Sequence, residues 1–129
     1  MIGIVQSIRH RWAEMIYRKE KKWEIRKTEP VRPDFLQQDT RLVYIYEPEE
    51  KAITGVYVLG DVYRTDGPEI AAQFPIGLDE DEVRAYGPGR DGIYRLWRAD
   101  AAQRYEEALP LQAFGLKRAP QSWCYVGKL

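Results

Sequence analysis

The residues best suited to chemistry lie in one short segment, EKKWEIRK, over positions 20–27. Trp23 and Ile25 alternate there with charged side chains, which is typical of a β-strand with one apolar and one charged face. Such a strand can lie at the solvated edge of a sheet, where ion pairs between its side chains are worth little. It can also turn its charged face toward a ligand. The residue pattern alone leaves both interpretations open.

Four charged residues of this segment indicate the chemistry that a site would have. Glu24 and Arg26 share one face of the expected strand with Lys22. Lys21 points to the other face unless the strand only begins there. A carboxylate between cations stays ionised, and a lysine beside other cations loses part of its proton affinity. A lysine in that state can serve as a nucleophile or as a base.

Basic side chains are concentrated at the start of the chain. Over all 129 residues, 20 Lys and Arg balance 20 Asp and Glu, so the bulk charge gives no affinity for nucleic acid. Residues 1–32 nevertheless carry a net charge of +5, whereas residues 66–82 carry six acids and no base. The basic segment interleaves cations and aromatic rings: Arg9, Arg11, Trp12, Lys19, Lys21, Lys22, Trp23, Arg26 and Lys27. Because cations bind phosphates and aromatic faces stack on exposed bases, this composition is suited to a nucleotide or a single strand.

Other kinds of site find little support in the sequence. Cys124 is the only cysteine and His10 the only histidine, so an intramolecular disulfide and a thiolate zinc cluster are excluded. Neither a Walker sequence nor a spaced-glycine dinucleotide fingerprint occurs. The acids at positions 79–82 lack the spacing of a calcium loop and favour the start of a helix. We therefore expect no metal and no other cofactor.

Length and composition favour a single domain over residues 1–129, because 44% of the residues are hydrophobic and a second core would not fit. The sequence contains no apolar leader and no run of about 18 apolar residues. We therefore expect a cytoplasmic protein with no membrane partner.

The hydrophobic pattern predicts an α+β arrangement that would position the charged segment. Strands are expected over residues 1–8, 21–27, 41–47, 52–64 and 119–129. Residues 93–99 and 101–109 are interpreted as two strands or as a strand followed by a helix, and their residue types favour strands. Short helices are expected over residues 9–20, 68–74 and 78–86, with Ser7 as the cap of the first. Five or six strands with short helices between them favour a small curled or closed sheet.

Several motifs, in the same order along the chain, resemble the ASCH domain family of the PUA-like superfamily. Members typically show S-I-K-P near the start, G-x-K at a helix end, E-x-R in a strand, V-Y-I-Y and I-x-G in two further strands, and R-P-P-Q-S-F-x-Y near the end. The counterparts here are SIRH, Lys21, Glu24 with Arg26, VYIY, ITGV and RAPQSWCYV. The resemblance implies a small PUA-like β-barrel of about five to six mostly antiparallel strands with short helices.

Three positions depart from this family pattern. Lys19 stands where a glycine usually precedes the motif lysine, Arg9 replaces a lysine, and Ala119 replaces a proline. The fold should tolerate all three, and Lys19 is expected to reshape the mouth of the cleft.

The resemblance also implies a function, since the proposed role of the family is recognition of RNA or modified nucleotides in a basic and polar cleft. The family's cleft lysine, acid and arginine fall on Lys21, Glu24 and Arg26. With the polar positions of the first strand, the adjoining basic residue and the terminal PQS motif, the expected ligand-binding set is Ser7, Arg9, Lys21, Glu24, Arg26, Lys27, Gln121 and Ser122.

Some ASCH-like proteins resemble small amidohydrolases that remove an acyl group from the exocyclic amine of cytidine with a Lys, a Thr and a Glu. This sequence keeps Lys21 but has Glu24 in place of the threonine. We therefore predict a binding module for RNA, a nucleotide or a nucleoside. The alternative is a nucleoside amidohydrolase or RNA-cleaving enzyme, in which Lys21 and Glu24 would be catalytic. A protein partner also stays open, because Trp and Tyr are common in protein interfaces.

Overall fold

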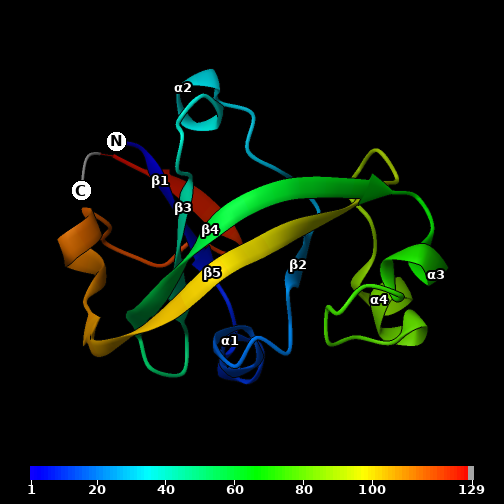
Figure 1. Ribbon diagram of the computed structural model, residues 1–129, viewed down its shortest axis with the longest axis horizontal. Helices are drawn as coiled ribbons and strands as arrows, with labels where there is room; N and C mark the ends of the chain where they lie inside the picture. The colour runs from blue at the N-terminus through cyan, green and yellow to red at the C-terminus, as the bar shows by residue number, and fades with distance from the viewer. Residues whose placement is uncertain (128–129) are drawn as a thin grey trace.

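The computed structural model describes residues 1–127, which form one six-stranded sheet with short helices around it (Figure 1). The strands are β1 (Gly3–Ser7), β2 (Trp23–Arg26), β3 (Leu42–Glu47), β4 (Ala52–Thr65), β5 (Tyr94–Leu109) and β6 (Trp123–Val126). The helices are α1 (His10–Tyr17), α2 (Pro33–Leu36), α3 (Pro68–Ala71), α4 (Glu80–Tyr86) and the 3-10 helix η1 (Leu111–Phe114). Neighbouring strands follow the order β2-β5-β4-β3-β1-β6, and they pair antiparallel except β1 with β3.

The two longest strands, β4 and β5, curl the sheet. They run side by side across the molecule over 14 and 16 residues (Figure 1). Their register shifts at three places, and such irregularities bend a strand and increase its twist. The sheet therefore curves into a half-barrel.

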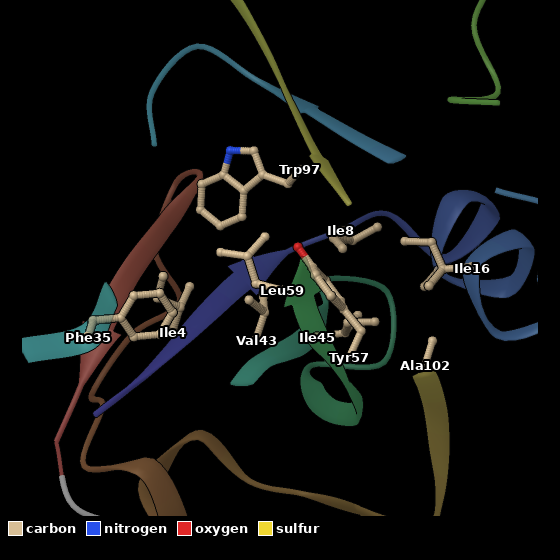
Figure 2. Packing of buried hydrophobic residues seen from close by; sticks show 11 residues of the cluster. Ile4, Ile8, Ile16, Phe35, Val43, Ile45, Tyr57, Leu59, Trp97 and Ala102 are labelled. Carbon is tan, nitrogen blue, oxygen red and sulfur yellow. The ribbon is translucent and has the colours of Figure 1, made fainter. Parts of the chain in front are cut away.

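The main hydrophobic core packs α1 and α2 against the sheet (Figure 2). Its buried side chains are Ile4, Ile8, Ala13, Ile16, Phe35, Val43, Ile45, Tyr57, Leu59, Trp97 and Ala102. Burying one large apolar side chain contributes about 1.5–3 kcal/mol relative to leaving it exposed. This core therefore holds β1, β5 and the start of α1 in place, and these are the elements that surround the site described below.

A second hydrophobic cluster holds β2 from the other side. Ile25 of β2 and Leu96 of β5 pack against buried residues of α3, α4 and the connection between them. Side chains alternate along a strand, so the residues on either side of Ile25 turn to the opposite face of β2. Glu24 and Arg26 consequently face the interior of the half-barrel, where Glu24 is paired in register with the fully buried Trp97.

Most of the predicted elements are confirmed. The favoured strands over 93–99 and 101–109 are confirmed, and the structure joins them into the single strand β5. The acids at 79–82 begin α4, where Asp79 and Glu82 form a capping box in which each side chain accepts a hydrogen bond from the other's backbone N–H. The last predicted strand is observed as β6, and its positions 128–129 lie outside the described residues.

The prediction that Ser7 caps the first helix is wrong. The Ser7 hydroxyl donates to the carbonyl of Pro120 at 2.7 Å, and Arg9 occupies the position before α1 without a side-chain cap. Ser7 is the last residue of β1, so its side chain is used to tie that strand to the segment before β6.

Candidate functional site

The charged segment lies where the half-barrel stays open. β2 pairs with β5 and β1 pairs with β3 and β6, so within residues 1–127 no strand ladder joins β1 to β2. Arg26 bridges this gap, because its Nη2 donates to the carbonyl of Ser7 at 2.7 Å. A cavity of about 190 Å³, which we call the seam cavity, opens beside the bridge. It is lined by Ser7, Ile8, Arg9, Trp12, Lys21, Glu24, Ile25, Arg26, Ile76, Leu78 and Tyr86.

Three charged side chains of the seam cavity are almost completely buried. Lys21, Glu24 and Arg26 expose 2%, 4% and 9% of their surface. Both cations meet the same carboxylate oxygen, since Arg26 Nη1 lies 3.1 Å and Lys21 Nζ 3.6 Å from Glu24 Oε1. The interpretation of this segment as a solvated edge strand is therefore wrong.

The residue at which β2 begins determines which cations lie beside Glu24. Because β2 begins at Trp23, Lys21 precedes the strand and does not follow its alternation. The Lys21 Nζ donates to the carbonyls of Trp23 at 2.8 Å and Ile76 at 2.5 Å. Lys22 is exposed instead, so the prediction that Lys22 shares a charged face with Glu24 is wrong.

Burial is the main influence on ionisation in the seam cavity. It lowers the pKa of Lys21, because the ammonium loses hydration, while Glu24 opposes this shift and Arg26 reinforces it. Burial also raises the pKa of Tyr86, which therefore keeps its hydroxyl proton and its capacity to donate. The two carbonyls and the carboxylate around Lys21 Nζ favour the charged form of the amine, and we describe it as an ammonium.

Several buried polar atoms here have no hydrogen-bond partner within residues 1–127, namely Glu24 Oε2, Arg26 Nε and Gln6 Nε2. Leaving a buried polar group unpaired costs about 1–3 kcal/mol, so such groups in a native structure call for an explanation such as a ligand or water. Glu24 supplies a free acceptor and Arg26 a free donor. Both atoms are covered by neighbouring atoms, so a ligand with one donor and one acceptor would pair with them only after those neighbours move aside.

Gln6 is a residue that sequence reasoning missed. It lies in β1 and is fully buried, and its Oε1 accepts a hydrogen bond from the Tyr57 hydroxyl at 2.7 Å. The only signal in the sequence was one amide within the apolar run MIGIVQSI. A strand buried on both faces gives no periodic pattern that would mark such a position as polar and functional.

Two aromatic rings line the seam cavity, Trp12 of α1 and Tyr86 of α4. The ring of Trp12 carries the Arg11 guanidinium at 4.3 Å from its centroid, and it packs against Gly77. Gly77 has φ of +82°, and a Cβ at this position would lie 2.7 Å from the indole. Glycine is therefore required here both by the backbone conformation and by the close approach of the ring.

A broader groove of about 1030 Å³ lies next to the seam cavity. It is lined by Lys27, Thr28, Glu29, Val31, Pro88, Gly89, Arg90, Asp91, Arg95 and Gln121. The Lys27 Nζ lies 5.1 Å from the centroid of the Tyr86 ring, which belongs to the cavity, so the two spaces adjoin there. Arg95 is neutralised by Glu29 and Asp91, whereas Lys27 and Arg90 form no ion pair within residues 1–127.

The residues predicted to bind a ligand are thus divided between two neighbouring spaces. Ser7, Arg9, Lys21, Glu24 and Arg26 line the seam cavity. Lys27 and Gln121 line the groove. Ser122 lines neither, and its carbonyl accepts a hydrogen bond from the backbone N–H of Ser7 at 2.9 Å.

Two further findings concern the described part of the chain. No group of three His, Cys, Asp or Glu in residues 1–127 is placed to hold a metal ion. None of the helices in the same range has the length and apolar character needed to cross a membrane.

Comparison with solved structures identifies similar folds. The ASCH protein of Zymomonas mobilis matches with a TM-score of 0.78 at 19% identity, covering 98% of this chain and 88% of that protein. A serine-to-alanine variant of the same protein matches with a TM-score of 0.77 at 18% identity, covering 98% and 89%. The N-terminal domain of Staphylothermus marinus McrB matches with a TM-score of 0.52 at 16% identity, covering 86% and 77%. No protein-family model matches the sequence, and no curated protein does.

The half-barrel with its short helices is therefore a small α+β fold of the PUA-like kind. Within that class the chain has the fold of the Zymomonas mobilis ASCH protein, which confirms at the level of the fold the resemblance of its sequence motifs. Because the identities are below 20%, these matches concern the fold and not the side chains of the site.

Proposed function

We propose that this chain is a binding module for RNA or a nucleotide, with the ligand held in the seam cavity and the adjoining groove. The observation that carries the proposal is the unpaired Glu24 Oε2 and Arg26 Nε, which are buried among the residues of the cavity. A nucleobase edge presents donors and acceptors side by side, so it can pair with both atoms.

The residues around Glu24 Oε2 and Arg26 Nε are suited to a nucleobase inside the seam cavity, with the phosphate of the nucleotide outside it. Trp12 and Tyr86 supply aromatic surface for a planar ring, and stacking of a base on an aromatic side chain is worth about 1–3 kcal/mol. In the groove, Lys27 and Arg90 are exposed cations that can meet phosphates, whereas Arg9 at the mouth of the seam cavity is paired with Glu49 at 2.8 Å. The seam cavity, with a volume of about 190 Å³, is too small for a polynucleotide, so the rest of such a ligand would lie in the groove.

Substitution of Glu24 tests this proposal. Nucleosides, nucleotides and short single-stranded RNAs are first ranked by thermal shift, because a ligand that binds only the native state raises the Tm. Glu24→Gln keeps the size of the side chain but removes its charge and replaces one acceptor with a donor. We expect the affinity for the best ligand, measured by calorimetric titration, to fall about tenfold or more.

Glu20→Gln is the matched control, because Glu20 is exposed, lies outside the seam cavity and undergoes the same chemical change. Circular dichroism establishes that both variants are folded. Equal affinity of the two variants for every ligand that the wild type binds would contradict the proposal.

A second candidate, a nucleoside amidohydrolase or RNA-cleaving enzyme, is favoured by the lowered pKa of buried Lys21, since a less basic amine is a better nucleophile or base at neutral pH. Two observations speak for binding instead. The Lys21 amine donates to two carbonyls beside a carboxylate, and Glu24 cannot donate the proton that a threonine hydroxyl would supply.

Incubation with an N-acylated cytidine and with a labelled short RNA separates the two candidates. We expect neither acid release nor strand cleavage above the rate in buffer. Turnover that Lys21→Met abolishes, while Lys51→Met at an exposed position outside the seam cavity leaves it intact, would establish the enzyme and displace the proposed binding role.

A further inference from the structure

A second basic cavity lies at the start of β2, between the end of α1 and residues 98–101 of β5. It has a volume of about 240 Å³, and its charged lining residues are Lys19, Lys21, Lys22, Arg98 and Asp100. Lys21 also lines the seam cavity, where Glu24 balances its charge. Asp100 accepts a hydrogen bond from Arg98 at 2.8 Å. The Lys19 Nζ donates to the carbonyl of Ala102, which does not balance its charge, so the exposed cations Lys19 and Lys22 remain in excess. The cavity is therefore suited to an anion.

The backbone around this cavity is strained. Within residues 1–127, three residues other than glycine have positive φ, and two of them, Lys19 at 66° and Ala101 at 47°, line this one cavity. A left-handed conformation is unfavourable for a residue with a side chain. The ASCH pattern usually has glycine at the position of Lys19, which would avoid this cost. Strain of this kind persists most often where it serves a function.

A row of aromatic rings continues from the cavity along the edge of the second hydrophobic cluster, against which Trp23 and Phe74 are partly buried. Trp23 is paired in register with Arg98, whose guanidinium lies 5.7 Å from the centroid of the indole. Phe74 packs on Trp23 at 5.1 Å between centroids, and Tyr63 packs on Phe74 at 4.9 Å. Tyr63 is 43% exposed. Arg98 therefore joins the basic cavity to this aromatic row, which consists of Trp23, Phe74 and Tyr63.

We propose that the basic cavity and the aromatic row form a second binding site for single-stranded nucleic acid, on the face of β2 opposite Glu24. Lys19 and Lys22 would hold a phosphate, and the aromatic row would stack a neighbouring base. An acidic peptide could pair with the cations, but it has no bases to stack on the three adjoining aromatic rings. This favours nucleic acid. The inference rests on the proposed function, because it assigns a further contact surface to the same class of ligand.

Two single substitutions test the site. Lys19→Gly removes an amine and relieves the left-handed strain, so the variant should fold at least as stably as the wild type. Lys22→Gln removes an exposed charge. The probe is a short oligouridylate, with affinity measured by fluorescence anisotropy over a range of salt concentrations. We expect each variant to bind severalfold more weakly and to lose about 0.7 from the log-log salt slope.

Lys51→Gly is the matched control, because Lys51 is also an exposed lysine with positive φ, 53°, and it lies in the turn between β3 and β4, outside both cavities. It should leave affinity and slope unchanged. Lys19→Gly and Lys22→Gln variants that match Lys51→Gly in both quantities would overturn the inference. An oligomer of glutamate that binds as tightly as the oligouridylate would overturn it as well, since the bases would then contribute nothing.

The proposals for the second site and for the seam cavity can be tested independently. A single nucleoside has no phosphate, so its binding should depend on Glu24 and be insensitive to Lys19→Gly and Lys22→Gln. If Glu24→Gln abolishes nucleoside binding while the oligouridylate binds all lysine variants equally, the second site fails and the proposed function stands. If the oligouridylate depends on Lys19 and Lys22 while Glu24→Gln changes no affinity, the second site stands and the seam cavity fails.

Discussion

At the scale of single residues, the candidate site depends on Glu24. One of its carboxylate oxygens meets both Lys21 and Arg26, and the other has no partner within residues 1–127. Burying a charge is favourable only while its counter-charges and hydrogen bonds are in place, because the lost hydration must be compensated. One acceptor of Glu24 and one donor of Arg26 therefore stay without a hydrogen bond in the described part of the chain.

Arg26→Met tests whether these charges compensate one another. The substitution removes one of the two cations from Glu24 and the bridge to the carbonyl of Ser7, and we expect the free energy of unfolding to fall by about 3 kcal/mol. Urea denaturation followed by tryptophan fluorescence measures the change. Arg118→Met, at an exposed position without an ion pair in the described range, should change it by less than about 0.5 kcal/mol. Similar losses in both variants would mean that the buried cluster contributes no net stability.

At the scale of elements, β2 is positioned from both sides. Ile25 is held by the cluster under α3 and α4, while Glu24 faces the main core beside Trp97. The connection between α3 and α4 also shapes the seam cavity, because Ile76 accepts a hydrogen bond from Lys21 and Gly77 packs against Trp12. A substitution in this connection should therefore change the affinity for the ligand, because it alters the wall of the seam cavity.

Gly77→Ala provides that change, and Gly92→Ala separates its two effects. Both glycines have φ near +80°, but a Cβ at position 77 would lie 2.7 Å from the Trp12 ring, whereas one at position 92 would have no atom within 4 Å. We expect both variants to lose about 1 kcal/mol of stability through backbone strain. Only Gly77→Ala should also displace Trp12 and weaken nucleoside binding, as measured by calorimetric titration. Equal binding by the two variants would exclude Trp12 as a wall of the ligand site.

At the scale of the whole molecule, the open half-barrel and the distribution of charge act together. The net charge of the chain is zero, so any attraction for a polyanion must be local. Lys27 and Arg90 in the groove are exposed cations without an ion pair within residues 1–127, near the place where the sheet stays open. The fold thus places a polar cavity and free cations side by side.

The salt dependence of binding tests this local attraction. The affinity for a short single-stranded RNA should fall with salt, with a log-log slope of about −0.7 for each phosphate contacted. A nucleoside, which carries no phosphate, should bind with almost no salt dependence. Both slopes come from fluorescence and calorimetric titrations at several salt concentrations. A flat response for the RNA would rule out phosphate contacts in the groove.

The amino-acid sequence by itself determined the elements and the class of fold. The aromatic and β-branched residues over 41–47 and 52–64 predicted β3 and β4, and the acids at 79–82 predicted the start of α4, because these signals are local. The order of the motifs indicated the ASCH fold, which the structural comparison confirms. The sequence also singled out Lys21, Glu24 and Arg26 as the residues of interest, although it left open whether they were solvated.

Only the tertiary structure decided that Glu24 and Arg26 are buried. The same alternation suits an edge strand with a wet charged face, and the outcome depends on α3 and α4, some 50 residues further along the chain, which cover the face of Ile25. The structure likewise added Gln6 to the unpaired polar atoms, moved Lys22 to a different cavity, and placed Lys27 with Gln121 in the groove. Local sequence sets the periodicity of a strand, but which face meets water is set by what packs against it, and those contacts are distant in sequence.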